Sequence, residues 1–240
     1  MIQHLYAAAV VAPSLEDFAD MDNTPHYDDA RRNLVRFVPR DAGTMLDVGC
    51  GGGGFGRSVH EVRPDITIFG VEPDPIGARH AAAAPYAQVA EGFFPEAADQ
   101  LHVERFDVIF FNDVLEHMAE PGSAVIAAKE HLAPGGMVVA CIPNVRHMSV
   151  WWPLIRRGRW QYEDYGILDR THLRFFTESS MRQLFEDNGW AVVSSEGVNR
   201  TRQPMRPGED GWKSVALSRL TRGRSDPFLW TQYVLQAVPF

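Results

Sequence analysis

A glycine-rich segment carries the strongest chemical signal in the sequence. The run LDVGCGGGG occupies residues 46–54 and lies between an expected strand and an expected helix. Glycine has no side chain, so a ligand can lie against the backbone, and the first turn of the following helix offers unpaired N–H groups. The segment therefore predicts a cofactor-binding loop.

Two cofactors could use this loop. Gly49, Gly51 and Gly54 fit the dinucleotide fingerprint, and Glu72 lies about where such proteins keep a ribose-binding acid. However, Asp47 stands two residues before the first glycine, and a pyrophosphate prefers N–H groups with no anion nearby. A carboxylate suits the sulfonium and ammonium groups of S-adenosylmethionine better. Asp47 therefore favours S-adenosylmethionine over NAD, while a purely structural turn, capped by Asp47, stays open.

Two histidines follow expected strands. In parallel α/β sheets, ligands bind at the edge where the strands end. His117 comes after the fourth strand and His147 after the fifth. Methyl transfer to a hydroxyl requires removal of its proton, and a neutral imidazole can accept it. We predict His117 as the first candidate base and His147 as the second. A packing role for His117 remains an alternative.

Short apolar runs alternate with helical stretches along the chain. This alternation is typical of βαβ units, and we expect an α/β fold with a doubly wound, mostly parallel sheet. The expected strands cover residues 45–48, 66–71, 87–90, 106–111 and 137–142, and the expected helices cover residues 55–62, 76–84 and 121–132.

The segments before and after these units differ in character. Residues 1–44 predict an N-terminal helical extension, with a helix that begins near Asp28 and Asp29 and ends before Pro39. Residues 143–176 are rich in Trp, Tyr, Arg and His. We expect this insert to cap the substrate site. Its aromatic residues either stack on a sugar-like ring or form the core of a small helical cap.

The last third of the sequence predicts one more helix and two more strands of the sheet. Thr177 suits the N-cap of a helix that closes at Asn188 and Gly189, and a strand is expected at residues 190–193. Residues 199–224 are basic and predict a loop, and residues 228–238 predict an antiparallel last strand. We treat residues 1–240 as one domain.

Composition excludes several classes of function. The 240 residues carry 31 acidic and 23 basic side chains, and a net charge of -8 argues against a nucleic-acid partner. Two cysteines cannot build a disulfide framework, so we expect a cytoplasmic protein, and no segment predicts a membrane anchor. Because His26, His102 and His131 show no metal-binding spacing, we predict no obligatory metal.

Four motifs together resemble the class I S-adenosylmethionine-dependent methyltransferases. They occupy residues 46–53, 70–74, 106–117 and 132–139, in the order and at the spacing of that family, and the resemblance covers residues 25–195. Within the insert, residues 158–164 and 168–177 resemble bacterial methyltransferases associated with surface-polysaccharide and natural-product sugar pathways.

The resemblance implies roles for individual residues. Asp47, Gly49 and Gly51 would line the methionine side of the cofactor, Glu72 would accept both ribose hydroxyls and Pro73 would pack on the adenine. Phe93 stands where many relatives carry an acid that faces the adenine amino group. The implied cofactor-binding set is Asp47, Gly49, Cys50, Gly51, Glu72, Pro73, Phe93, Asn112, Arg31 and Tyr27.

Our hypothesis is an enzyme that transfers a methyl group from S-adenosylmethionine to an oxygen of a small acceptor, such as a sugar or a natural-product scaffold. An N-methyltransferase is the alternative among enzymes of this class, because a neutral amine needs less help from a base. An NAD-dependent oxidoreductase and a non-catalytic cofactor-binding subunit are alternatives from other classes. Oligomerisation is possible in each case.

Overall fold

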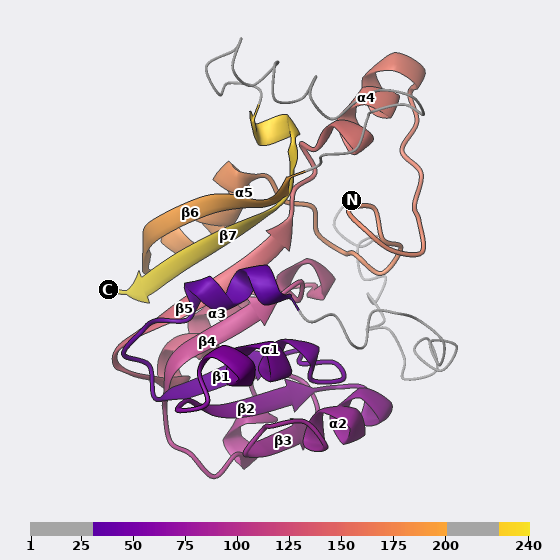
Figure 1. Ribbon diagram of the computed structural model, residues 1–240. Coiled ribbons are helices and arrows are strands. Elements are labelled where there is room, and N and C mark those ends of the chain that lie inside the picture. Colours follow the sequence, from indigo (N-terminus) through magenta and orange to yellow (C-terminus); the bar gives the residue numbers. More distant parts are fainter. Residues whose placement is uncertain (1–30, 201–225) are drawn as a thin grey trace, which may run out of the picture.

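A central sheet with helices on both faces organises the part of the chain that the structure describes. The computed structural model describes residues 31–200 and 226–240. In this part, seven strands lie in the order β3-β2-β1-β4-β5-β7-β6 (Figure 1). The strands are β1 (Thr44–Val48), β2 (Thr67–Glu72), β3 (Gln88–Glu91), β4 (Phe106–Asn112), β5 (Leu132–Pro143), β6 (Trp190–Arg200) and β7 (Trp230–Pro239).

Strands β1 to β5 pair with one another in parallel, whereas β7 is antiparallel to both β5 and β6. The α-helices are α1 (Gly54–Val62), α2 (Pro75–Ala82), α3 (Pro121–His131), α4 (Met148–Arg157) and α5 (Glu178–Glu186). Short 3-10 helices are η3 (Arg32–Phe37), η4 (Ala98–Gln100), η5 (Leu115–His117) and η6 (Asp226–Phe228). The doubly wound sheet with an antiparallel last strand is therefore confirmed.

The centre of the sheet is buried on both faces. In β4, Ile109 and Phe111 belong to one core cluster, whereas Val108 and Phe110 belong to the other, because successive side chains of a strand point to opposite faces. All four side chains are fully buried. A strand buried in this way needs a continuous apolar run, which is why residues 106–111 were recognisable in the sequence.

Local sequence signals set the starts of two helices. The side chain of Asp74 accepts a hydrogen bond from the backbone N–H of Gly77, and Pro75 occupies the first turn of α2. Thr177 forms a capping box with Ser180 at the start of α5, as the sequence predicts.

The N-terminal helix differs from its prediction. Arg31 has a positive φ of 37°, so it lies outside η3, which begins at Arg32 and is a 3-10 helix. Val38 is extended because the following Pro39 disfavours a helical conformation at the residue before it. The expected start near residues 28 and 29 lies outside the described residues, as does the rest of the extension before Arg31.

Two strands are longer than predicted. Leu132 already pairs with Phe106, and the ladder shifts before Met137 pairs with Val108, so residues 133–136 form an irregularity inside β5. β6 runs to Arg200 instead of ending near Val193. Residues 199 and 200 of the predicted basic loop are therefore strand, and residues 201–224 lie outside the described residues.

The insert at residues 143–176 consists of α4 followed by an irregular segment. In Figure 1, α4 lies beyond the end of β5, away from the middle of the sheet. Trp152, Trp160, Tyr162 and Tyr165 are exposed, by 39–63%. The aromatic residues therefore do not form a closed core. Within residues 31–200 and 226–240, no helix has the length and apolar character needed to span a membrane.

Candidate active site

The glycine loop joins the end of β1 to α1 and requires its glycines. Gly49, Gly51 and Gly53 have positive φ angles of 68°, 52° and 80°. Side chains with a Cβ strain such a conformation, and a Cβ at Gly49 would lie 2.7 Å from Cγ2 of Val114. The backbone N–H groups of Gly49 and Cys50 donate to the carbonyl of Val71 and hold the loop against β2.

Glu72, the last residue of β2, lies beside this loop. Its carboxylate accepts hydrogen bonds from the backbone N–H groups of Gly51, at 2.7 Å, and Asp74, at 2.9 Å. The side chain is nearly buried, and burial raises its pKa to about 7. Glu72 thus links the loop to the start of α2, where the ribose of a nucleotide cofactor is expected.

Asp47 is almost completely buried in β1. The hydroxyl of Tyr86 donates to its Oδ2 across 2.7 Å. Burial raises the pKa of Asp47 to about 6, although the Tyr86 hydrogen bond and the charge of Arg31 oppose the shift. Tyr86 also accepts a hydrogen bond from the N–H of Gly56 in α1. Tyr86 was not predicted as a site residue, because it lies in the loop after α2 and no motif marks it.

Asn112 provides a test of whether the edge of the sheet fits a polar ligand. It is the last residue of β4 and is 6% exposed, yet neither its amide nitrogen nor its amide oxygen has a hydrogen-bond partner of normal geometry in the described part of the chain. Buried amides without partners are uncommon, and a ligand is one explanation. The ammonium and carboxylate of S-adenosylmethionine would satisfy both atoms.

The remaining predicted cofactor residues differ in their surroundings. Cys50 is buried against Gly70, and burial raises the pKa of its thiol. Pro73 is half-buried, and the side chain of Phe93 is 60% exposed beyond β3. Tyr27 lies outside the described residues.

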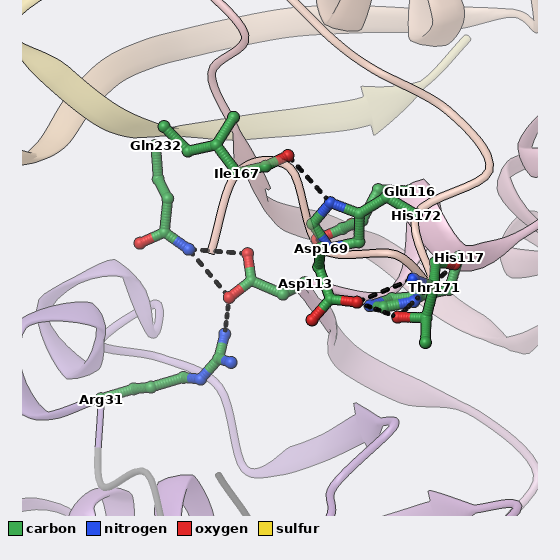
Figure 2. Close-up of polar contacts among 9 residues, drawn as sticks. All are labelled: Arg31, Asp113, Glu116, His117, Ile167, Asp169, Thr171, His172 and Gln232. Atoms are coloured by element: carbon green, nitrogen blue, oxygen red, sulfur yellow. Dashed lines mark hydrogen bonds and ion pairs between the residues drawn. The ribbon is translucent and has the colours of Figure 1, made fainter. Parts of the chain in front are cut away.

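Arg31 forms an ion pair with Asp113. Its Nη1 lies 2.7 Å from Oδ2 of Asp113. The Nε2 of Gln232, in β7, donates to both oxygens of the same carboxylate, at 2.7 and 2.8 Å (Figure 2). Asp113 itself has a positive φ of 52° directly after β4. These contacts connect the N-terminal segment, β4 and β7 at one point beside Asn112.

A second group of polar side chains follows in η5. Glu116 is 1% exposed, and neither of its carboxylate oxygens has a hydrogen-bond partner within the described residues. Nε2 of His172, from the insert, lies 4.0 Å from Oε1 of Glu116. The rings of His172 and His117 pack edge to face, with centroids 4.7 Å apart. Figure 2 shows His172 between Glu116 and the carbonyl of Ile167.

The insert holds both histidines in place. The N–H groups of Leu173 and Arg174 donate to the carbonyl of Glu116 and attach the segment to η5. Nδ1 of His117 lies 3.3 Å from the carbonyl of Thr171 and 3.1 Å from its hydroxyl. Partial desolvation of its ring by the packed insert and the neighbouring His172 lower the pKa of His117, so its imidazole is neutral near pH 7. This arrangement fixes the ring from one side.

His147 has a structural role that its sequence position did not reveal. It is the N-cap of α4, where Nδ1 accepts from the N–H of Ser149 and lies 2.8 Å from the hydroxyl of the same residue. Burial lowers its pKa to about 4. The geometry thus joins His117 to a polar cluster and gives His147 a capping function. A role as base stays a prediction for both histidines.

The comparisons with known proteins agree with this geometry. A family model described as a methyltransferase domain matches residues 24–195. A ubiquinone biosynthesis O-methyltransferase from Methylobacterium nodulans is 28% identical over 183 residues, which cover 70% of this chain and 67% of that protein. Matches to further proteins of the same name span between 43% and 68% of their lengths.

Solved structures show the same fold. A SAM-dependent methyltransferase from Archaeoglobus fulgidus superposes with a TM-score of 0.61 at 16% identity, over 85% of this chain and 90% of that one. The plantazolicin methyltransferase BamL, in a complex that contains S-adenosylhomocysteine (SAH), gives a TM-score of 0.56 at 13% identity. The match covers 87% of this chain and 80% of that one. The match to a methyltransferase family decides between the two cofactors considered. The chain belongs to the methyltransferase domain family, and it is an enzyme that uses S-adenosylmethionine as its cofactor.

Proposed function

We propose that this methyltransferase transfers the methyl group to a hydroxyl oxygen of a small polar acceptor, such as a sugar or a natural-product scaffold. The observation that carries the proposal is the contact between His117 and the insert. Thr171 holds Nδ1 of His117, so Nε2 is the ring nitrogen left to meet an acceptor. The relatives named as O-methyltransferases support an oxygen acceptor.

The chemistry requires little from the protein beyond position and proton transfer. When bound, S-adenosylmethionine supplies a methyl group on a positively charged sulfur, which keeps the electron pair of the broken C–S bond. Asp47, Glu72 and Asn112 would hold the cofactor. His117 takes the proton of the acceptor hydroxyl as the new C–O bond forms, which is the general-base role expected of a neutral imidazole. Alignment and exclusion of water provide most of the acceleration.

The insert supports an acceptor with a ring. Trp160 and Tyr162 both pack on Phe175, at centroid distances of 5.1 and 6.2 Å, and Phe175 contacts His172 at 6.3 Å. Flat, partly exposed aromatic faces beside histidine and carboxylate groups are suited to stacking on a sugar or another polyhydroxylated ring.

The proposal is tested with paired acceptors. Release of S-adenosylhomocysteine is measured for a panel of sugar nucleotides, phenols and catechols, each beside an analogue with an amine in place of one hydroxyl. We expect turnover of hydroxyl compounds and a loss of kcat of about 100-fold or more in His117→Gln. Exclusive turnover of the amines, with His117→Gln fully active, would show an N-methyltransferase instead. Glu72→Ala serves as the control with impaired cofactor binding.

A further inference from the structure

Glu116, His117 and His172 form a cluster whose composition is typical of a metal site. One ligand atom from each residue lies within 4.8 Å of the other two. Glu116 and His117 are adjacent in η5, whereas His172 belongs to the insert 55 residues further along the chain. The sequence predicted no metal because its histidines show no local metal-binding spacing, whereas this cluster forms only in the folded protein.

The carboxylate of Glu116 lacks partners. A buried carboxylate without any hydrogen bond is costly, and proteins normally pair such a group or use it to bind a cation. Both oxygens of Glu116 are without a partner of hydrogen-bond geometry in the described residues, and Nε2 of His172 is too far away, at 4.0 Å, to donate to it. A cation between these atoms would satisfy the carboxylate.

The two histidines are oriented as metal ligands usually are. Metal-binding histidines commonly donate the N–H of one ring nitrogen to a carbonyl or carboxylate, which leaves the other nitrogen for the metal. Nδ1 of His117 faces the carbonyl of Thr171 at 3.3 Å, and Nδ1 of His172 faces the carbonyl of Ile167 at 3.1 Å (Figure 2). In both rings Nε2 is therefore the nitrogen with an available lone pair.

Further contacts make the cluster rigid and accessible. Oδ1 of Asp169 accepts hydrogen bonds from the N–H of Thr171, at 2.7 Å, and from its hydroxyl, at 2.6 Å, which shapes the turn before His172. Glu116 and His172 are buried, while His117 is exposed. The cluster thus has two buried ligands and one side that faces solvent, where a substrate oxygen can approach.

We propose that Glu116, His117 and His172 bind one divalent transition-metal ion, of the zinc type, at the acceptor side of the active site. Ligands that each lie about 2.1 Å from one cation are separated by about 3–4 Å, so shortening the widest separations of the observed cluster by about 1–2 Å closes it around an ion. Two imidazoles and one carboxylate favour zinc, cobalt or iron over magnesium, which prefers oxygen ligands.

The role of the ion rests on the proposed function. Three protein ligands leave a coordination position for the hydroxyl of the acceptor, and a bound cation lowers the pKa of such a hydroxyl. The hydroxyl proton would then be released to solvent, and the oxygen would form the C–O bond. With the ion bound, His117 would hold the ion instead of accepting the proton itself, so its general-base role would apply only to the ion-free protein.

The site is tested by direct metal binding, without an acceptor. The full chain, with no affinity tag, is stripped with a chelator and titrated with Co²⁺ while the visible d–d absorption bands are recorded. We expect one Co²⁺ per chain, displaced by Zn²⁺ but not by millimolar Mg²⁺. Glu116→Gln, His117→Asn and His172→Asn should each weaken Co²⁺ binding by about 100-fold or more, because each removes a ligand. His80→Asn, which changes an exposed histidine in α2, should bind like the unchanged protein.

Stability gives a second readout if the substitution at buried Glu116 prevents folding. Zn²⁺ should raise the melting temperature of the unchanged protein and of His80→Asn, but not that of His117→Asn, whose side chain is exposed. Equal Co²⁺ binding in all variants, or no binding in the unchanged protein, would overturn the metal site and leave the proposed O-methylation standing. Metal binding without turnover of any hydroxyl acceptor would keep the metal site and overturn the proposed O-methylation.

Discussion

The hydroxyl of Tyr86 donates a hydrogen bond to the carboxylate of Asp47 across 2.7 Å. Through its oxygen, Tyr86 also accepts from the N–H of Gly56, so one side chain connects the acid of β1 to the first turn of α1. A Cβ at Gly56 would lie 2.3 Å from the Tyr86 ring, which explains the glycine at this position. The cofactor loop is therefore braced from behind by a residue outside its own motif.

Tyr86→Phe should destabilise the protein and weaken cofactor binding together. The substitution leaves the buried Asp47 without its hydroxyl donor, which costs about 1–3 kcal/mol. We expect a lower melting temperature and a several-fold weaker affinity for S-adenosylhomocysteine by calorimetry. Tyr162→Phe, at an exposed position in the insert, is the matched control and should change neither quantity. Unchanged affinity in Tyr86→Phe would mean that cofactor binding does not depend on the hydrogen bond from Tyr86 to Asp47.

Glu72→Ala should weaken binding of S-adenosylhomocysteine without unfolding the protein. A buried carboxylate that accepts two hydroxyl donors contributes about 1.5–3 kcal/mol per bond, so the loss should be at least about 10-fold. Calorimetric titration measures it, and Glu61→Ala, at an exposed site in α1, serves as the control. Equal affinity in both variants would remove Glu72 from the cofactor site.

Cofactor affinity should depend on pH through the same carboxyl group. Burial raises the pKa of Glu72 from 4.5 to about 7, so the group is protonated in the ligand-free protein below that pH. Only the ionised form can accept both ribose hydroxyls. The affinity for S-adenosylhomocysteine should therefore fall as pH is lowered from 8 to 6, by at most about 10-fold per unit. Glu72→Gln cannot ionise and should give a flatter profile over this range.

Gly49→Ala should lower the free energy of unfolding much more than Gly135→Ala. Both glycines have a positive φ, of 68° and 83°, but a Cβ at Gly49 would lie 2.7 Å from Val114, whereas nothing lies within 4 Å of a Cβ at Gly135. Gly135→Ala should cost about 1–2 kcal/mol for the backbone alone, and Gly49→Ala about 1–3 kcal/mol more for the clash. Denaturant unfolding measures both. Adding Val114→Ala should relieve part of the cost at Gly49, and failure to do so would place the strain elsewhere.

Substitutions at His147 separate its capping role from a role as a base. His147→Ala removes the N-cap of α4 and should cost about 0.5–2 kcal/mol. Asparagine is a good N-cap but a poor base at neutral pH. We expect His147→Asn to restore the melting temperature and most of the activity lost in His147→Ala. A stable but inactive His147→Asn would instead identify His147 as the base.

The sequence predicted those parts of the fold that depend on strong local patterns. Strands β1 to β4 were placed within one residue at each end, because their apolar runs are bounded by glycine, proline and charged residues. The start of α5 was predicted from the capping preference of Thr177. The glycine loop and Glu72 were recognisable because their spacing is set by a single β-turn-α unit.

Features that depend on distant contacts could not be predicted in this way. The left-handed conformation of Arg31, which places η3 after it, accompanies an ion pair with Asp113. The continuation of β6 to Arg200 depends on pairing with Trp230 in β7. Likewise, His172 meets Glu116 only because the insert folds back onto η5, and no spacing within the sequence indicates that contact.

The position of β7 in the sheet has a consequence for folding during synthesis. This strand follows β6 in the sequence but lies between β5 and β6, so each of its neighbours emerges from the ribosome before it does. Until β7 has left the exit tunnel, β5 has an open edge and β6 has no partner strand in the described sheet, and such edges can pair with other chains. Gln232 also reaches Asp113 from β7. The nascent chain therefore completes the contacts around Asp113 only after β7 has joined the sheet.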